Sequence, residues 1–396
     1  MARTLPSFLL FGALALAQET ASNYADRAAE LVQQGDLKNA EHQLRKAIQL
    51  SPNDPSYLTS LGGVLGMEGQ LEQGNVYLAR AVQLRPGDAL LRRNLAANEW
   101  QLGRFQSAER NLELLLKADP NDDVAKFLLG MVSENRKNYS RSVALLESIP
   151  EMTRQRPEAL VALASSYYHL NERQNAQNCL NRVLTPPASP QILQAGGHLA
   201  IEQHDYPLAL RILTEAAHAQ QDSYQIFLMK AEAERRLNYF SQAVISARRA
   251  VELHSSVDTR RELALVEWHA GDKSQSASEF EALAREFPQN ASVLETYGAL
   301  LLEGGSPDDK ARAIAMLQKA IALDKSSAEA CYQIANVELA QGRLQLALKY
   351  LQDANRSDPA DSRVHFALSR VYRRLERNQD AERELQTYER LKAFQN

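Results

Sequence analysis

The stretch Gly103–Asp122, GRFQSAERNLELLLKADPND, decides the fold because it reads as a turn, one helix and a stop. Its opening glycine can adopt the left-handed backbone that a tight corner between helices needs. Ala108, Leu112 and Leu115 then recur at intervals of four and three residues, the apolar stripe of an amphipathic helix. Pro120 follows at a point where a helix cannot continue. The stretch therefore predicts a turn followed by one short helix.

The same pattern recurs along the chain at a fixed spacing. Moving 34 residues toward the N-terminus leads from Gly103 to Gly69, and another 34 residues lead to Gly35. Spacing and residue type are both kept in the three copies, so the chain contains an internal repeat. Its 396 residues then count repeated units and not globular domains, because each unit of a repeat protein packs on its neighbours.

The repeated unit resembles the tetratricopeptide repeat (TPR), a helix-turn-helix unit. That family places a small residue midway along the first helix, a glycine at the turn, alanines in the second helix and a proline at the end. The resemblance implies an all-α fold, a right-handed superhelical solenoid of about eleven TPR units. The second copy carries the pattern in Leu58, Leu61, Gly62, Leu65, Gly69, Leu78, Ala81 and Pro86.

The register can be followed to the end of the chain. A short segment, residues 18–20, precedes the repeats, which occupy residues 21–396. We expect the repeats to start near residues 21, 55, 89, 123, 157, 190, 224, 257, 291, 328 and 362. The centre of each first helix is small, which lets the two helices of a unit approach closely. These central residues are Ala28, Gly62, Ala96, Gly130, Ala164, Gly197, Ala231, Ala264, Gly298, Ala335 and Ser369.

Three places depart from the pattern. Lys137 stands where the turn glycine is usual, and Pro150 shortens the second helix of that repeat. Residues 185–190 contain three prolines and predict a bend or hinge between repeats. Residues 304–309 form a longer turn with three extra residues. We expect these to be tolerated irregularities and not sites.

The N-terminus differs from the repeats. Arg3 supplies a positive charge, residues 8–16 are an apolar run, and Ala15-Leu16-Ala17 has the pattern of a signal-peptidase site. The run is too short to span a bilayer as a helix. It predicts a signal peptide over residues 1–17, with an uncleaved anchor or a buried first helix as alternatives. The mature chain would be exported, periplasmic or secreted, with no integral membrane segment.

Composition excludes some classes of function. The net charge of -4 gives no electrostatic case for a nucleic-acid partner. Cys179 and Cys331 lie in different repeats, so we expect small buried side chains and no intramolecular disulfide. The eight histidines form no pair with the spacing of a metal site on one helix, and no nucleophile or phosphate-loop motif is present. The sequence therefore predicts no enzyme, no cofactor and no metal site.

The remaining candidate site is the surface of the first helices. In the family that the chain resembles, these helices line a concave groove, and their second, fifth, ninth and twelfth positions point into it. Large apolar or aromatic residues there can anchor a partner, or they can pack against the neighbouring repeat, and both interpretations are open for Trp100 and Trp268. The groove candidates are Leu90, Arg93, Trp100, Phe127, Met131, Tyr168, Leu228, Arg235, Arg261, Leu265 and Trp268.

Two specific partner types can be compared with the sequence. Family members that clamp a peptide carboxylate use a basic residue and Asn at the fifth and ninth positions, where the first repeat has Ala25 and Ala29. The carboxylate clamp is therefore not supported. Arginine doublets could contact an anionic polysaccharide, although neighbouring glutamates favour ordinary surface pairing. These doublets are Arg235-Arg236, Arg248-Arg249, Arg260-Arg261 and Arg373-Arg374.

Together these features predict a non-catalytic scaffold or adaptor for protein-protein interaction. The resemblance implies a role in a bacterial cell-envelope assembly, with a protein or peptide partner held along the groove. The alternative is a periplasmic holding chaperone or a subunit that binds or exports polysaccharide.

Overall fold

The computed structural model describes residues 20–185, 188–304 and 307–395, and within these ranges it contains 23 helices and no strand. The all-α fold class is confirmed. No helix of these ranges is long and apolar enough to cross a membrane. The predicted signal peptide, Pro186-Pro187 and Gly305-Ser306 lie outside the described residues, so the predictions made for them stay predictions. The longer turn expected over residues 304–309 is wrong at its described positions, because Gly304 ends the helix Ala291–Gly304 and Pro307 starts the helix Pro307–Leu323.

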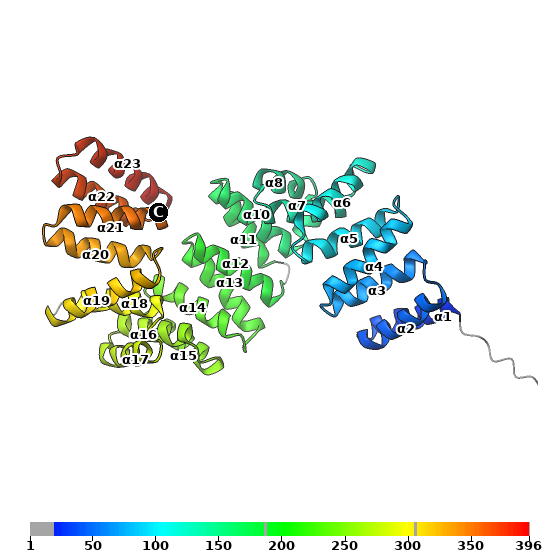
Figure 1. The fold of residues 1–396 in the computed structure, drawn as a ribbon, viewed down its shortest axis with the longest axis horizontal. Helices are drawn as coiled ribbons and strands as arrows, with labels where there is room; N and C mark the ends of the chain where they lie inside the picture. Colours follow the sequence, from blue (N-terminus) through cyan, green and yellow to red (C-terminus); the bar gives the residue numbers. More distant parts are fainter. Residues whose placement is uncertain (1–19, 186–187, 305–306, 396) are drawn as a thin grey trace, which may run out of the picture. The chain divides into compact units, whose positions relative to one another are not determined.

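The chain divides into two compact units, residues 1–182 and residues 183–396. Helices of the first unit run in chain order from blue to green in Figure 1. They are α1 (Ala21–Gln33), α2 (Leu37–Leu50), α3 (Pro55–Met67), α4 (Leu71–Leu84), α5 (Ala89–Gln101), α6 (Phe105–Ala118), α7 (Asp123–Asn135), α8 (Tyr139–Glu147), α9 (Pro150–Arg154), α10 (Pro157–His169) and α11 (Arg173–Val183).

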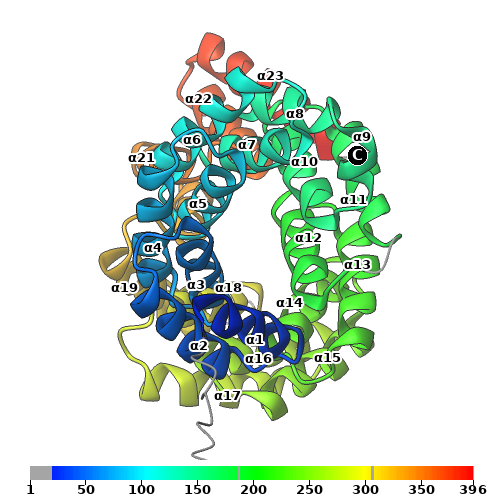
Figure 2. The ribbon, with the colours of Figure 1, turned by 90° about the vertical axis from the view of Figure 1, so that its right-hand side faces the viewer.

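The second unit is built in the same way, and Figure 2 shows its pairs α12–α13 and α14–α15. Within each unit a helix contacts mainly the helices just before and after it. The helices of the second unit are α12 (Pro190–Glu202), α13 (Tyr206–Ala219), α14 (Tyr224–Arg236), α15 (Phe240–Leu253), α16 (Val257–Ala270), α17 (Lys273–Glu286), α18 (Ala291–Gly304), α19 (Pro307–Leu323), α20 (Ala328–Ala340), α21 (Leu344–Ser357), α22 (Ser362–Arg374) and α23 (Asn378–Gln395).

The first helices begin where the sequence predicts repeats to start. For example, α1 begins at Ala21, α3 at Pro55 and α22 at Ser362. Local chemistry explains these starts: Asp54 and Asp88 lie just before α3 and α5, and their carboxylates accept hydrogen bonds from free backbone amides of the first turn. The number of repeats itself stays a prediction.

Close packing within each pair explains the small central residues. A methyl group built on Gly62 would lie 2.6 Å from Cγ of Leu78, which is in the second helix of the same pair. A methyl group built on Gly130 would lie 2.7 Å from Cγ of Leu146. Only a very small residue fits between these helices, so the small positions serve packing within the pair.

In the described turns between the two helices of a pair, one residue adopts the left-handed backbone. Gly35, Gly69 and Gly103 have φ angles of 77°, 78° and 72°. Lys137 occupies the equivalent turn between α7 and α8 with φ of 61°, although it has a Cβ. The left-handed backbone costs a residue other than glycine roughly 1–2 kcal/mol. The turn geometry is therefore imposed by the packed helix pair and does not depend on glycine.

The irregular fourth repeat is visible as an extra helix. Helix α8 ends at Glu147, and Pro150 starts the short helix α9, where a proline is tolerated because the first turn needs no amide donor. The two cysteines are unpaired and buried. Burial raises the pKa of the Cys179 thiol and of the Cys331 thiol to about 11, so both are neutral at pH 7.

Candidate partner-binding groove

A groove lies along the first helices of the first three repeats, α1, α3 and α5, all within the first unit. Its volume is about 610 Å³, within the range of roughly 300–1,000 Å³ that is usual for ligand sites. The lining residues come mainly from these three helices, with Leu44 added from α2 and Arg85 from the end of α4. The groove therefore spans three consecutive repeats.

Small side chains make the floor of the groove. They include Ala25 and Ala29 of α1 and Thr59 and Gly63 of α3. A methyl group built on Gly63 would meet no atom within 4 Å, so the space above this residue is open. These positions do not carry the residues of a carboxylate clamp, and their small size leaves room for the side chains of a partner.

The rim carries two large apolar side chains that face solvent. Met67 at the end of α3 is 65% exposed, and Leu90 near the start of α5 is 57% exposed. Asp88 is already used as the cap of α5, where it accepts hydrogen bonds from the amides of Leu90 and Leu91. Arg85 is exposed, so the groove carries a positive charge at one edge in addition to the Asp88 carboxylate.

The other predicted groove residues of the first unit are not at this site. The guanidinium of Arg93 forms an ion pair of 2.6 Å with Asp122, the cap of α7. Trp100 donates its indole N–H to Asn135 Oδ1 at 2.7 Å, so it bridges to the next repeat. Phe127, Met131 and Tyr168 are buried.

Most of the predicted residues of the second unit also contact neighbouring repeats. Trp268 is 7% exposed and belongs to a core cluster with Val293 and Tyr297 of α18. Arg235 pairs with Glu262 at 2.8 Å, and Arg261 contacts Ser292. Leu228 and Leu265 are partly buried. Among the predicted residues only Leu90 lines the groove of α1, α3 and α5, and partner binding by any of them stays a prediction.

Buried glutamates form a set that the sequence patterns above do not include. Glu99 accepts a hydrogen bond of 2.8 Å from Asn111 of the second helix in its own pair, and Glu234 accepts one of 2.7 Å from Ser246. Burial raises the pKa of Glu99 above its usual value. The recurrence of glutamate at one position of the first helices was the sequence signal that could have predicted this set. The set contains the eleventh residue of four first helices: Glu99, Glu234, Glu267 and Glu338.

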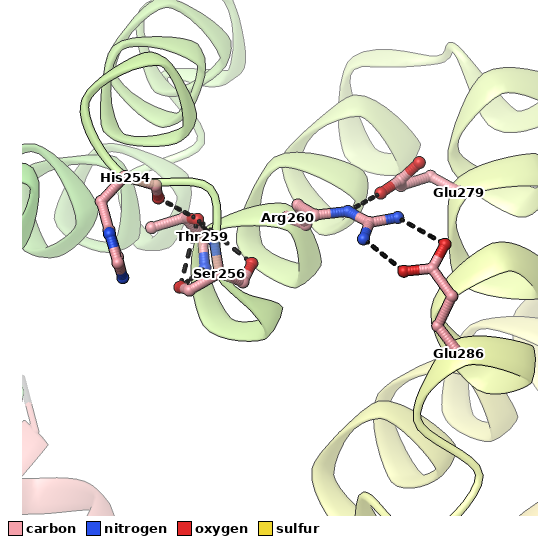
Figure 3. Close-up of polar contacts among 6 residues, drawn as sticks. All are labelled: His254, Ser256, Thr259, Arg260, Glu279 and Glu286. Carbon is pink, nitrogen blue, oxygen red and sulfur yellow. Dashed lines mark hydrogen bonds and ion pairs between the residues drawn. The ribbon is translucent and has the colours of Figure 1, made fainter.

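The arginine doublets are largely occupied by carboxylates. Figure 3 shows Arg260 of α16 held by two glutamates of α17, Glu279 at 2.6 Å and Glu286 at 2.7 Å. The same view shows Thr259 hydrogen-bonded to Ser256 and to the carbonyl oxygen of His254, which fixes the start of α16. Arg248 pairs with Glu267 at 3.2 Å. These contacts are the expected surface pairing, and they lower the charge available to a polysaccharide.

The described residues offer no candidate metal site. No group of three or more His, Cys, Asp or Glu side chains in the described ranges is arranged to hold a metal ion.

Stacked helix pairs with small central residues and a left-handed corner define a class, the helical repeat scaffolds. Models of the tetratricopeptide repeat match residues 21–54, 93–159, 195–258, 261–328, 310–365 and 338–393. The chain belongs to the tetratricopeptide repeat family. It is a scaffold for protein-protein interaction, and the fold is typically non-catalytic.

The solved structures that resemble this chain support its fold alone, because their sequence identity is low. No curated protein matches the sequence. The crystal structure of yeast Tom70 has a TM-score of 0.51 and 14% identity, over 94% of this chain and 95% of that chain. A tetratricopeptide repeat protein from Parabacteroides merdae has a TM-score of 0.48 and 16% identity, over 62% of this chain and 98% of that chain.

Proposed function

We propose that this protein is an exported, non-catalytic scaffold of a bacterial cell envelope, and that it holds a protein partner in the groove of α1, α3 and α5. Export rests on the N-terminal sequence: a positive start, an apolar run and an Ala-Leu-Ala site ending at Ala17. Partner binding rests on the groove, where a small-residue floor lies beside the exposed Met67 and Leu90.

The groove favours a defined partner over many clients. A holding chaperone needs a broad apolar surface, whereas this groove is confined to three consecutive first helices and has a volume of about 610 Å³. The partner segment that fits this shape has bulky apolar side chains that fill the floor, with a carboxylate near Arg85 at the edge. Polysaccharide binding would rest on the doublets, and Arg260 of one doublet is already held by two glutamates.

A pull-down from native envelope extract, with the mature chain from Gln18 as bait, gives the first test. Leu90→Glu places a charge on the rim of the groove, and Leu114→Glu is the matched control because Leu114 is 51% exposed on α6, outside the groove. Gly63→Leu places a bulky side chain at the floor, at a position where an added Cβ would meet no atom within 4 Å. Proteins that the unaltered chain and Leu114→Glu retain, and that Leu90→Glu and Gly63→Leu lose, are the candidates.

Direct binding then decides between the possibilities. A purified candidate is titrated against the mature chain by calorimetry, and a saturable one-to-one complex that Gly63→Leu weakens by at least about tenfold supports the proposal. Equal affinity for Gly63→Leu would place the partner elsewhere on the chain. Weak binding of many unfolded proteins would support the holding chaperone. Intact-mass measurement of the exported chain tests processing, since the expected mature form begins at Gln18.

A further inference from the structure

A second cavity lies in the second unit, between α13, α14 and α15. Its volume is about 670 Å³, again within the usual range for a ligand site. None of its lining residues belongs to the groove of the first three repeats. The lining residues that matter here are Ala217, Phe227, Lys230, Ile245, Arg248 and Arg249.

One side of the cavity is apolar. Ala217 of α13 and Phe227 of α14 form part of the wall. Ile245 of α15 stands at the mouth with 70% of its surface exposed. A ligand with a hydrocarbon group could cover this exposed side chain. Each Å² of apolar surface buried in this way contributes about 25 cal/mol to the free energy of binding.

The other side is rich in hydrogen-bond donors. Lys230 contacts Glu234 and lies 3.1 Å from Ser246 Oγ, so two of its three N–H groups have partners. Arg249 donates to Glu252 at 3.3 Å and to the carbonyl oxygen of Gln221 at 3.2 Å, which uses two of five donors. Donor capacity is therefore left over on both side chains.

Arg248 adds to this surplus. It donates to Glu267 at 3.2 Å through one of its five N–H groups, and 54% of its side chain is exposed. The side chain of Glu267 is almost fully buried, so the ion pair anchors one end of the exposed arginine side chain. Three cations thus line the cavity, and Glu252 is the one carboxylate among its lining residues.

A buried network fixes the position of the central cation. Ser246 donates to Glu234 at 2.7 Å, and Lys230 contacts both of these residues. Glu234 and Ser246 are both buried. Because a charge fixed in a partly dry site interacts more strongly than one in water, Lys230 is a pre-positioned donor at the cavity wall.

We propose that this cavity binds a carboxylate that is attached to a branched or aromatic hydrocarbon group. The carboxylate would accept hydrogen bonds from Lys230, Arg248 and Arg249, while the hydrocarbon group would pack on Phe227 and Ile245. A charged acceptor forms stronger bonds with these donors than a neutral one. A neutral sugar fits less well, since it offers these three cations no charged acceptor.

Two sources can supply this chemistry, a small free acid and the C-terminus of a peptide that ends in a large apolar residue. N-acetylphenylalanine serves as the probe, its amide is the neutral comparison, and an acetylated tripeptide ending in phenylalanine represents the peptide source. Binding to the mature full chain is measured by calorimetry and by ligand-observed NMR, with each probe up to about 10 mM. The tripeptide binding more tightly than the free acid would assign the peptide source, and the reverse order the small acid.

The variants are chosen from exposed positions so that folding is kept. Ile245→Glu brings a carboxylate to the mouth of the cavity, and Arg249→Gln removes one cation. Val76→Glu is the matched control, because Val76 is 67% exposed and, like Ile245, is the sixth residue of the second helix in its pair. Circular dichroism of each variant confirms that the helices are retained.

The proposal expects saturable binding of the acid and at least about tenfold weaker binding of the amide. Ile245→Glu and Arg249→Gln should each weaken the acid by about tenfold or more, and Val76→Glu should leave it unchanged. Equal binding of acid and amide, no effect of Ile245→Glu, or no saturable binding at all would each overturn it. The test does not involve the groove of α1, α3 and α5, so the two proposals stand or fall separately.

Discussion

Two adjacent glycines in α3 should respond to the same substitution in opposite directions. A methyl group at Gly62 would lie 2.6 Å from Cγ and 2.9 Å from Cδ2 of Leu78, and 3.1 Å from the carbonyl oxygen of Gly74. A methyl group at Gly63 would meet nothing within 4 Å. The perturbation is therefore Gly62→Ala compared with Gly63→Ala, one at the packed face of a helix and one at its open face.

The magnitudes follow from two opposing effects. Replacing glycine by alanine inside a helix stabilises by about 0.5–1 kcal/mol, and both glycines gain this because both are internal to α3. Overpacking at a close helix contact costs about 1–3 kcal/mol. Gly63→Ala should then stabilise by about 0.5–1 kcal/mol. Gly62→Ala should be less stable than Gly63→Ala by the overpacking cost of about 1–3 kcal/mol.

Hydrogen exchange followed by mass spectrometry is the suitable assay, because it reports the free energy of opening for peptides of α3 and α4 separately from the second unit. Amides of this pair should exchange faster in Gly62→Ala and more slowly in Gly63→Ala than in the unaltered chain. Peptides from α20 to α23 serve as an internal control and should not change. Equal protection in the two variants would refute the reasoning that Gly62 is small for packing and Gly63 for access.

Three further predictions concern buried side chains. Trp268→Ala should cost about 3–5 kcal/mol of stability, whereas Trp100→Ala, partly exposed and held by one hydrogen bond, should cost clearly less; equal shifts of the urea midpoint would contradict this. Glu262→Ala leaves Arg235 as a buried unpaired cation and should cost about 3–5 kcal/mol, and a cost below about 1 kcal/mol, typical of an exposed pair, would contradict it. Burial raises the folded-state pKa of Glu99, so its ionisation removes stability as pH rises from about 4.3 through that pKa. Glu99→Gln should therefore raise the urea midpoint at pH 7 and reduce the decrease of the midpoint with rising pH. A lower midpoint at pH 7 would show that ionised Glu99 stabilises the fold and would contradict this prediction.

The helices could be predicted from the sequence because their limits depend on local chemistry. Pro55 can start a helix but cannot continue one, and Asp54 before it supplies a cap. The small central residues were equally predictable, since the partner leucine comes from the next helix of the same pair. Lys137 shows the limit of local signals, because its left-handed turn is imposed by packing and not by its own preference.

The candidate site was harder to predict because exposure depends on the neighbouring repeat. Leu90 and Trp268 were both groove candidates, with packing against the next repeat left open for Trp268; Leu90 is exposed and Trp268 is buried against α18. Nothing within a single repeat separates these two cases. Likewise, neither Ala29 nor Gly63 alone indicates a site. The groove that they line is formed by three consecutive first helices together.

The limited range of helix contacts has a consequence for how the chain reaches its fold. In each unit the principal contacts join helices that are neighbours in chain order, or nearly so, as between α3 and α5. Such a chain has a low contact order, so each closing loop is short and its entropy cost small. Pairs can form one after another as the polypeptide emerges from the ribosome. Removing the last pair, α22 and α23, should therefore leave α12 to α19 folded, because none of them needs a late segment to complete its core.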